Sequence, residues 1–380
     1  MTNGLRMVFG GLCVAALAAC ATTPAPLTSA PAGSPLWFGA DLSYVNEMED
    51  CGAVYREDGA PVDPFALFAD RGANLVRVRL WNDAEWTEYS DLDDVRKTIR
   101  RSREQGMAVL LDFHYSDDGA DGDKQIIPRA WADIETTGEL AGALYRFTFN
   151  TLMTLHADGL LPEMVQVGNE TNPEIMRGPE DGKDPIDWAR NATLFNAGIR
   201  AVRDAAEKTG IDIEVMLHIA QPEHVMPWFE AAWEAGVQDF DQVGISYYRR
   251  WSSEDFDGLS RTIEAVHERW PEAEIILVET AYPFTLKSAD EASNLLTENT
   301  LIDGYPATVD GQLNYLVDLT QLVIDAGGSG IVYWEPAWVS TECSTRWGQG
   351  SHWENATFFD FENGNKVLPS IDYMRREYRP

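Results

Sequence analysis

A (β/α)8 barrel in one domain is the fold that this 380-residue sequence predicts. Three observations lead to it: eight short apolar runs, amphipathic helical segments between them, and no internal repeat or linker beyond residue 36. Strands that alternate with helices form parallel βαβ units, and eight such units fit in about 345 residues. The apolar fraction of 44% is ample for one large core.

The eight expected strands are spaced so that a helix fits between most consecutive pairs. They span residues 36–43, 74–81, 108–115, 164–170, 214–220, 242–248, 274–280 and 330–336. The clearest helices are expected at residues 92–106 and 193–210, and each ends at a glycine, a residue that often terminates helices. We therefore assign residues 36–380 to the barrel domain.

The first 35 residues differ in composition and are expected to serve export. Residues 1–19 place Arg6 before an apolar stretch too short for a lasting membrane anchor, which predicts a signal peptide. The Leu-Ala-Ala-Cys sequence at its end resembles a bacterial lipobox, so lipidation of Cys20 is expected; ordinary secretory cleavage is the alternative. Residues 20–35, rich in Pro, Ala, Ser and Thr, would form a tether. We expect an exported protein, lipid-anchored at the bacterial cell envelope.

Two cysteines remain once the leader is removed. Cys13 would leave with the signal peptide and Cys20 would carry lipid, which leaves Cys51 and Cys343. In an exported protein such a pair predicts one disulfide, here between the first and last βα loops. Two buried free thiols are the alternative.

The net charge of −33 narrows the possible partners. Such acidity argues against nucleic acid or another polyanion and favours a neutral substrate, although an acidic bacterial surface explains it equally well. The chain also contains 13 tryptophans, whose flat rings often line carbohydrate clefts. We expect a monomer whose partner is a neutral polysaccharide.

Polar and aromatic residues gather at the C-terminal ends of the expected strands, which form the active face of such barrels. They are Asp41, Arg77, Arg79, Trp81, Asp112, His114, Asn169, Glu170, His218, Tyr248, Glu279 and Trp334. Two of them, Glu170 and Glu279, are glutamates on strands across the mouth from each other. Paired carboxylates in an aromatic mouth are typical of glycoside hydrolysis, with one acid and one nucleophile or base.

The neighbours of the two glutamates suggest their roles. Arg77 is expected beside Glu279 and would hold it ionised as a nucleophile. Aromatic walls around Glu170 would raise its pKa, which suits a general acid. Period-two alternation turns Tyr248 inward, where it can donate to the nucleophile, and sends Tyr247 to the core.

Two further residues at the mouth are expected to contact the sugar. Asn169 would hydrogen-bond the sugar 2-OH. Trp334 would form the floor under the sugar at the cleavage site.

Longer motifs carry a family resemblance. They are GADLSYVNEMEDCG (39–52), LDFHYSDDGADGDKQ (111–125), VQVGNETN (165–172), GISYY (244–248), VETAYPF (278–284) and residues 333–361. Together they resemble glycoside hydrolase family 53 of clan A, the arabinogalactan endo-β-1,4-galactanases. The resemblance implies retaining cleavage of β-1,4-galactosidic bonds in the galactan side chains of pectin. It makes Glu170 the acid/base and Glu279 the nucleophile, with carboxyl groups roughly 5–5.5 Å apart.

The resemblance also implies a substrate-binding rim. Arg77, His114, Asn169, Tyr248 and Trp334 match that rim. From their place at strand ends, Asp112 and His218 are expected to join it, and Trp338 and Trp347 in the long last loop are expected to serve as stacking floors. Trp353 in that loop is expected to pack it onto the last helix instead. Two departures affect the outer subsites: Gly119 stands where the family usually has Trp, and Arg249 where Pro is common.

No cofactor is expected. Residues 287–294 offer Asp290, Glu291 and Asn294 to calcium, which some bacterial members carry after strand seven, but they lack the alternating spacing of a strong calcium loop. The rim histidines, His114 and His218, lie on different strands without the short spacing of a metal motif.

Two alternatives to a galactanase remain from the sequence. The first is a non-catalytic glycan-binding surface lipoprotein, against which the two intact carboxylates count. The second is a clan A relative that acts on mannan or cellulose.

Overall fold

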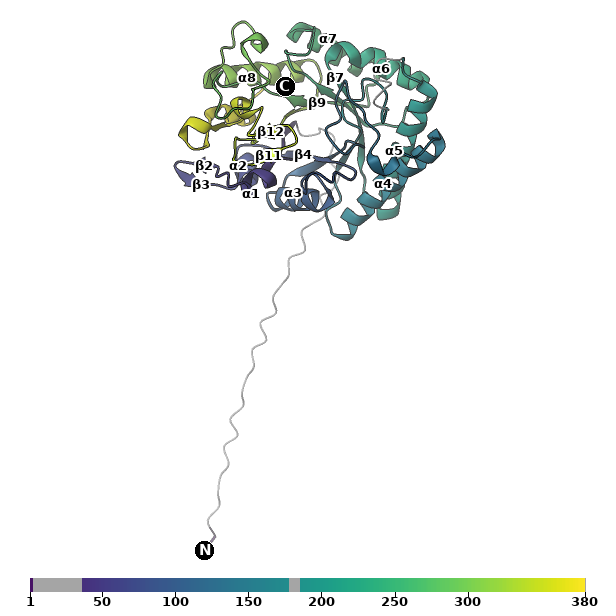
Figure 1. Ribbon diagram of the computed structural model, residues 1–380, viewed down its shortest axis with the longest axis horizontal. Helices are drawn as coiled ribbons and strands as arrows, with labels where there is room; N and C mark the ends of the chain where they lie inside the picture. The colour runs from purple at the N-terminus through teal and green to yellow at the C-terminus, as the bar shows by residue number, and fades with distance from the viewer. Residues whose placement is uncertain (3–35, 178–184, 380) are drawn as a thin grey trace. The chain divides into compact units, whose positions relative to one another are not determined.

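The expected strands close into a barrel in the computed structural model, which describes residues 1–2, 36–177 and 185–379. All eight are parallel, and each pairs with its neighbours in chain order until β10 returns to β1 (Figure 1). They are β1 (Trp37–Asp41), β4 (Leu75–Leu80), β5 (Ala108–Phe113), β6 (Met164–Val167), β7 (Glu214–Ala220), β8 (Gln242–Ser246), β9 (Glu274–Thr280) and β10 (Gly330–Tyr333). The predicted fold class is confirmed.

Helices surround the barrel (Figure 1). They are α1 (Val45–Asp50), α2 (Pro64–Asp70), α3 (Leu92–Glu104), α4 (Thr137–Ala157), α5 (Trp188–Thr209), α6 (Pro222–Glu234), α7 (Phe256–Arg269) and α8 (Val309–Asp325). Helix α5 begins five residues before the expected start because the Asp187 side chain accepts hydrogen bonds from the backbone N–H groups of Ala189 and Arg190. It ends as expected at Gly210, which adopts φ 70°.

Shorter elements decorate the loops. Four two-residue strands form a small sheet, namely β2 (Arg56–Glu57), β3 (Ala60–Pro61), β13 (Phe359–Asp360) and β14 (Lys366–Val367). The last βα loop contains a hairpin of β11 (Ser344–Thr345) and β12 (Gly348–Gln349). Single turns of 3₁₀-helix lie at Arg129–Trp131, Glu298–Thr300, Glu354–Ala356 and Phe361–Asn363, and a longer one at Pro369–Arg375.

Two layers fill the inside of the barrel. The lower layer is apolar and comprises Leu75, Ala108, Leu110, Met164, Met216, Ile276, Val278 and Val332. Because side chains alternate along a strand, residues two positions later face inward one layer higher. Those residues are Arg77, Asp112, Gln166 and His218, all at most 1% exposed, and we refer to these four as the polar layer. The barrel interior therefore changes from apolar to charged just below its C-terminal mouth.

The expected disulfide is present and joins Cys51, at the end of α1, to Cys343, at the base of the β11–β12 hairpin. It links residues 292 positions apart, so it closes a very long loop of the unfolded chain. The chain-entropy account predicts that such a bridge stabilises the fold by on the order of 5 kcal/mol.

Replacing both Cys51 and Cys343 by serine is therefore expected to lower Tm in thermal denaturation. The unreduced mature protein should yield the linked peptides in mass spectrometry. Two free thiols in protein recovered after export would contradict the pairing.

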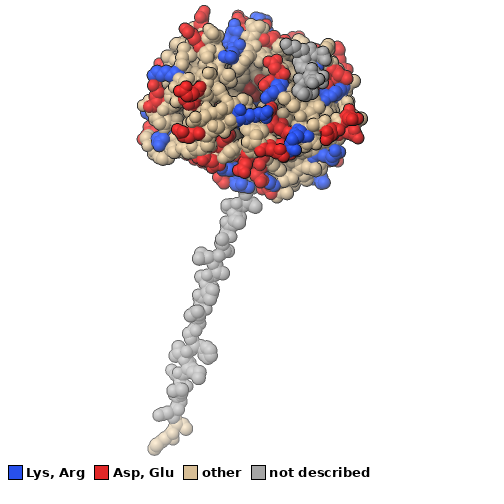
Figure 2. Space-filling model, viewed as in Figure 1, with Lys and Arg blue, Asp and Glu red and all other residues tan. Residues whose placement is uncertain are grey.

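The N-terminal predictions lie outside the described part of the chain, which begins its continuous course at Leu36. The signal peptide, Cys20 and the tether therefore remain predictions. Among the helices that the structure describes, none is both long and apolar enough to cross a membrane. Acidic side chains are scattered over the face shown in Figure 2, with Lys and Arg between them.

Candidate active site

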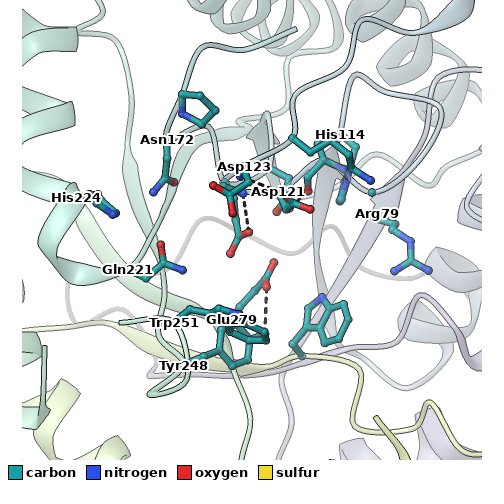
Figure 3. A pocket seen from close by; sticks show the side chains of 18 of the residues that line it. Arg79, His114, Asp121, Asp123, Asn172, Gln221, His224, Tyr248, Trp251 and Glu279 are labelled. Carbon is teal, nitrogen blue, oxygen red and sulfur yellow. Dashed lines mark hydrogen bonds between the residues drawn. The ribbon is translucent and has the colours of Figure 1, made fainter. Parts of the chain in front are cut away.

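A cleft of about 1340 Å³ opens at the C-terminal ends of the barrel strands. Figure 3 shows side chains from several loops converging on its centre. Of the expected rim residues, those that line the cleft are Arg77, His114, Asn169, Glu170, Tyr248, Glu279, Trp334, Trp338 and Trp347. The strand ends thus meet as the sequence predicted.

The turn that carries Glu170 is conformationally unusual. Strand β6 ends at Val167, and Gly168 follows with φ 89°, a conformation that favours glycine. A Cβ atom at Gly168 would lie 2.7 Å from the side chain of Thr171, so the turn also leaves no room for a larger residue. Glu170 itself has φ 44°. Non-glycine residues with positive φ are strained and cluster at functional sites.

Glu170 and Glu279 lie close together. One oxygen of each carboxyl group lies within 4.8 Å of the other. This proximity agrees with the spacing of roughly 5–5.5 Å between the carboxyl groups of retaining glycosidases.

Glu279 is held by two donors. Arg77 Nη1 lies 2.8 Å from its Oε1, and the Tyr248 hydroxyl donates to its Oε2 at 3.1 Å, as expected. Tyr247 is fully buried in the core, also as expected.

Arg77 favours the ionised form of Glu279, but it does not by itself offset burial, so it holds the negative charge less firmly than expected. Burial raises the pKa of Glu279 well above its ordinary value, although Arg77 opposes this rise. The reason is that Arg77 also pairs with Asp41 at 2.9 Å and Asp112 at 2.8 Å, so one cation serves three carboxylates.

Glu170 is desolvated, and its pKa is raised as the sequence predicted. Burial raises its pKa to about 7. The negative charge of Asp121 acts in the same direction, whereas hydrogen bonds from Ser246 and from the backbone N–H of Gly122 lower the pKa. The Gly122 N–H lies 3.3 Å from Glu170 Oε2. A carboxyl group with this pKa can donate a proton near neutral pH.

Asp112 and His218 do not reach the rim, contrary to our expectation. Both are 0% exposed and belong to the polar layer beneath the cleft. His218 Nε2 lies 2.8 Å from the Ser246 hydroxyl, and its Nδ1 lies 3.0 Å from Asn169 Oδ1. Asp112 accepts from Arg77 and contacts His114 Nε2 at 3.0 Å. These residues position the rim instead of forming it.

The same layer fixes Asn169 and His114. Asn169 Oδ1 accepts from Arg77 Nη2 at 2.6 Å, and its Nδ2 donates to the Ala120 carbonyl at 2.8 Å. His114 Nδ1 accepts from the Ala120 N–H at 3.0 Å, so its Nε2 carries the proton that points to Asp112.

Aromatic rings form the floor and one end of the cleft. Trp338 stacks on Tyr44 with ring centroids 4.2 Å apart and meets Trp334 edge-on. Trp353 is buried and packs edge-on against Trp334, with ring centroids 4.7 Å apart. Its Nε1 donates to the Trp334 carbonyl at 3.1 Å, so it supports the floor from below.

Trp347 lies at the tip of the β11–β12 hairpin and is 39% exposed. It meets Trp86 edge-on at 5.5 Å. A Cβ atom built on Gly119 would have Trp347 as its one neighbour within 4 Å, at 4.0 Å. The ring from the last loop therefore lies over the position where the expected family aromatic is missing.

Sequence reasoning missed other residues that line the cleft. They include Asp121, Asn172, Gln221, His224 and Trp251. His224 lies in the first turn of α6, and the other four lie in loops beyond the strands, where no periodic pattern marks the direction of a side chain. Arg79, noted only as a strand-end residue, is fixed by an ion pair with Glu335 at 2.9 Å.

A metal does not fit the central cluster. Ligand atoms of Glu170, His218 and Glu279 lie within 4.8 Å of one another. However, Arg77 already contacts Glu279, and both ring nitrogens of His218 have hydrogen-bond partners. In the loop considered for calcium, Asp290 accepts from the backbone N–H groups of Ala292 at 2.7 Å and Ser351 at 2.9 Å.

An eight-stranded barrel with two close carboxylates at its C-terminal mouth defines a glycoside hydrolase. Residues 37–374 match the model of glycosyl hydrolase family 53, and the chain belongs to that family.

Two relatives and one solved structure illustrate the match. The chain is 54% identical over 347 residues to the arabinogalactan endo-beta-1,4-galactanase of Cellvibrio japonicus, covering 91% of this chain and 92% of the relative. It is 32% identical over 379 residues to the endo-beta-1,4-galactanase of Bacillus subtilis, and the match covers 89% of this chain and 85% of that relative. The GH53 catalytic domain of Ignisphaera aggregans superposes with a TM-score of 0.82 at 31% identity, and the match covers 90% of this chain and 96% of that domain.

Proposed function

We propose that this protein is a retaining endo-β-1,4-galactanase that cuts the galactan side chains of pectin. The mechanism is supported by the proximity of Glu170 and Glu279, whose carboxylate oxygens come within 4.8 Å of each other. The substrate is supported by the 54% identity to a named arabinogalactan endo-beta-1,4-galactanase. A purely glycan-binding role would leave the strained and desolvated Glu170 without a use.

The two carboxyl groups divide the reaction between them. Burial raises the pKa of both groups, and the charge of Glu170 raises the pKa of Glu279 further, so ionisation of one carboxyl group opposes ionisation of the other. Direct contact with Arg77 favours the negative charge on Glu279, which leaves the proton on Glu170. Glu279 then attacks the anomeric carbon while Glu170 protonates the departing glycosidic oxygen. In the second step, Glu170 takes a proton from water, and that water cleaves the Glu279 ester with the anomeric configuration restored.

Neighbouring groups orient the sugar. One of the two Asn169 Nδ2 hydrogens is taken by Ala120, and the other is left to bond the 2-OH of the sugar. Trp334 offers its ring as the floor. These steps are carried by protein groups, so the proposed reaction requires no cofactor.

One digest tests the proposal. Purified protein is incubated with galactan, mannan and cellulose, and the products are sized; galactan alone should yield short oligosaccharides. Proton NMR of the first products should show the β-anomer. Cleavage of mannan or cellulose instead would assign a different substrate, and initial α-anomer would refute retention.

Trp347→Ala is expected to impair small galacto-oligosaccharides more than the polymer. Loss of a stacking platform costs roughly 1–3 kcal/mol of binding, by analogy with other aromatic stacking. Long chains have further subsites that hold them, whereas short substrates also lose kcat because remote binding energy assists the reacting centre. Initial rates on galactotetraose and on galactan measure the difference. Equal losses on both would make Trp347 structural.

We further propose that the mature protein is exported and anchored through a lipid on Cys20, and that it acts as a monomer. Its support is the lipobox-like sequence before Cys20 and the tether that follows. Cys20→Ala should shift galactanase activity from the membrane fraction to the soluble one after cell fractionation. Activity that stays in the membrane fraction would refute the anchor.

A further inference from the structure

Gln221 adopts a strained backbone conformation at the edge of the cleft. It follows β7 directly and has φ 60° and ψ 133°, although it is not glycine. Pro222 comes next and begins α6, and the Gln221 N–H donates to the Ser246 carbonyl at 3.0 Å. A strained residue that carries a side chain is retained where that side chain has a use, because glycine would relieve the strain.

A double hydrogen bond ties Gln221 to the turn that carries Glu170. Asn172 accepts from the Ala220 N–H at 2.7 Å and donates to the Ala220 carbonyl at 2.8 Å. Asn172 lies two residues after Glu170, and Ala220 is the residue just before Gln221. The position of Gln221 is therefore fixed relative to the general acid.

The Gln221 amide is available to a ligand. Its side chain is partly exposed and lines the cleft beside Asn172 and His224 (Figure 3). Within residues 36–177 and 185–379 the structure shows no hydrogen-bond partner for this amide. An amide offers both a donor and an acceptor without charge, which matches neighbouring hydroxyl groups of a neutral sugar.

The order of the strands places Gln221 on the Glu170 side of the cleft, away from the Trp334 floor. Strands β7 and β8 lie between β6, which precedes Glu170, and β9, which carries Glu279. Strand β10 and the Trp334 floor lie on the far side of β9. Figure 3 shows Gln221 and His224 on one side of the cleft centre and Arg79 and His114 on the other.

Building on the proposed function, we propose that Gln221 is a specificity-determining residue that hydrogen-bonds the galactose on the leaving-group side of the cleaved bond. The same contact serves sugar acceptors. In transfer, an acceptor hydroxyl gives its proton to Glu170, the bond between the anomeric carbon and Glu279 breaks, and a new glycosidic bond forms. Gln221 then favours a sugar over water as the acceptor.

The test compares two substrates that differ in the leaving group. Galactotetraose presents a sugar to Gln221, whereas nitrophenyl β-1,4-galactobioside presents an aryl group. Gln221→Met keeps the length of the side chain but removes its hydrogen bonds, so kcat/KM for galactotetraose should fall about tenfold while that for the aryl substrate stays within about threefold. With added galactobiose, the ratio of transfer to hydrolysis should fall about tenfold as well.

Gln221→Gly separates this role from a structural one. Relief of the positive φ should raise Tm while the activity on galactotetraose falls as it does in Gln221→Met. Gln105→Met is the matched control, because Gln105 is exposed in the loop between α3 and β5 at the opposite end of the barrel.

Three outcomes decide the assignment. Selective loss on galactotetraose and on transfer supports it. Equal loss on both substrates, or unchanged activity on galactotetraose, overturns it while the galactanase proposal stands. Failure of the unmodified protein to cleave galactotetraose or galactan refutes the proposed function itself.

Discussion

Glu279→Ala is expected to lower kcat by at least about 10⁴-fold, because loss of a nucleophile removes the covalent route altogether. Substrate binding should persist, since the Trp334 floor and the aromatic rings beyond it are untouched. Steady-state kinetics on nitrophenyl galactobioside measure the rate, and calorimetric titration with galactotetraose measures the affinity. The variant should fold, because truncation leaves Arg77 with two carboxylate partners, Asp41 and Asp112.

Two controls make the Glu279 result specific. Azide can enter the space that the carboxylate leaves and attack the activated substrate, so it should restore turnover and give an α-galactosyl azide. Glu234→Ala removes an exposed glutamate at the end of α6 and should change neither rate nor affinity. Near-normal turnover by Glu279→Ala would show that another group is the nucleophile.

The barrel and its reactive pair could be predicted because their signals are local and periodic. Each strand is a short apolar run, and parallel strands in a barrel bring their C-terminal ends together. Glu170 and Glu279 therefore meet wherever the barrel closes. The pairing of Cys51 with Cys343 could be predicted because these are the two cysteines that remain once Cys13 leaves with the signal peptide and Cys20 carries lipid.

Depth inside the barrel could not be predicted in the same way. Alternation along one strand gives the face of a residue and the order of the layers, but the depth of a layer below the mouth depends on the register between neighbouring strands. Asp112, in β5, and His114, directly after β5, both face inward. Asp112 is nevertheless buried in the polar layer, whereas His114 reaches the cleft. His218 was misplaced for the same reason. The shared use of Arg77 by three carboxylates also depends on contacts among β1, β5 and β9 that no single segment reveals.

Loop conformations were the other part that sequence could not supply. The direction of Gln221 depends on a positive φ and on a hydrogen-bond link from Asn172, two features of tertiary structure. The position of Trp353 under Trp334 likewise follows from how the last loop folds back over the mouth. Long loops lack the periodicity that makes strands and helices predictable.

Glu170→Gln is expected to abolish activity on galactan, and with it the alkaline limb that the native protein shows. In the native protein the acid form of Glu170 is required, and its pKa is raised to about 7, so kcat/KM on galactan should fall as the pH rises through about 7. Glutamine cannot donate a proton, so the variant should lose activity on galactan at every pH. An aryl galactobioside needs little protonation of its leaving group, so its first step should survive and the ester on Glu279 should accumulate.

The same substitution should stabilise the fold in a pH-dependent manner. Because the pKa of Glu170 rises from 4.5 in the unfolded chain to about 7 in the folded protein, the folded state holds its proton more tightly. The contribution of Glu170 protonation to the free energy of unfolding is therefore complete below about pH 4.5. It declines as the pH rises and is lost above about pH 7. Glu170→Gln should thus raise Tm at pH 8 relative to the native protein and have less effect at pH 4. Glu207→Gln, at an exposed site on α5, provides the comparison outside the cleft. An alkaline limb that survives in Glu170→Gln, or a Tm gain equal at both pH values, would mean that another group donates the proton.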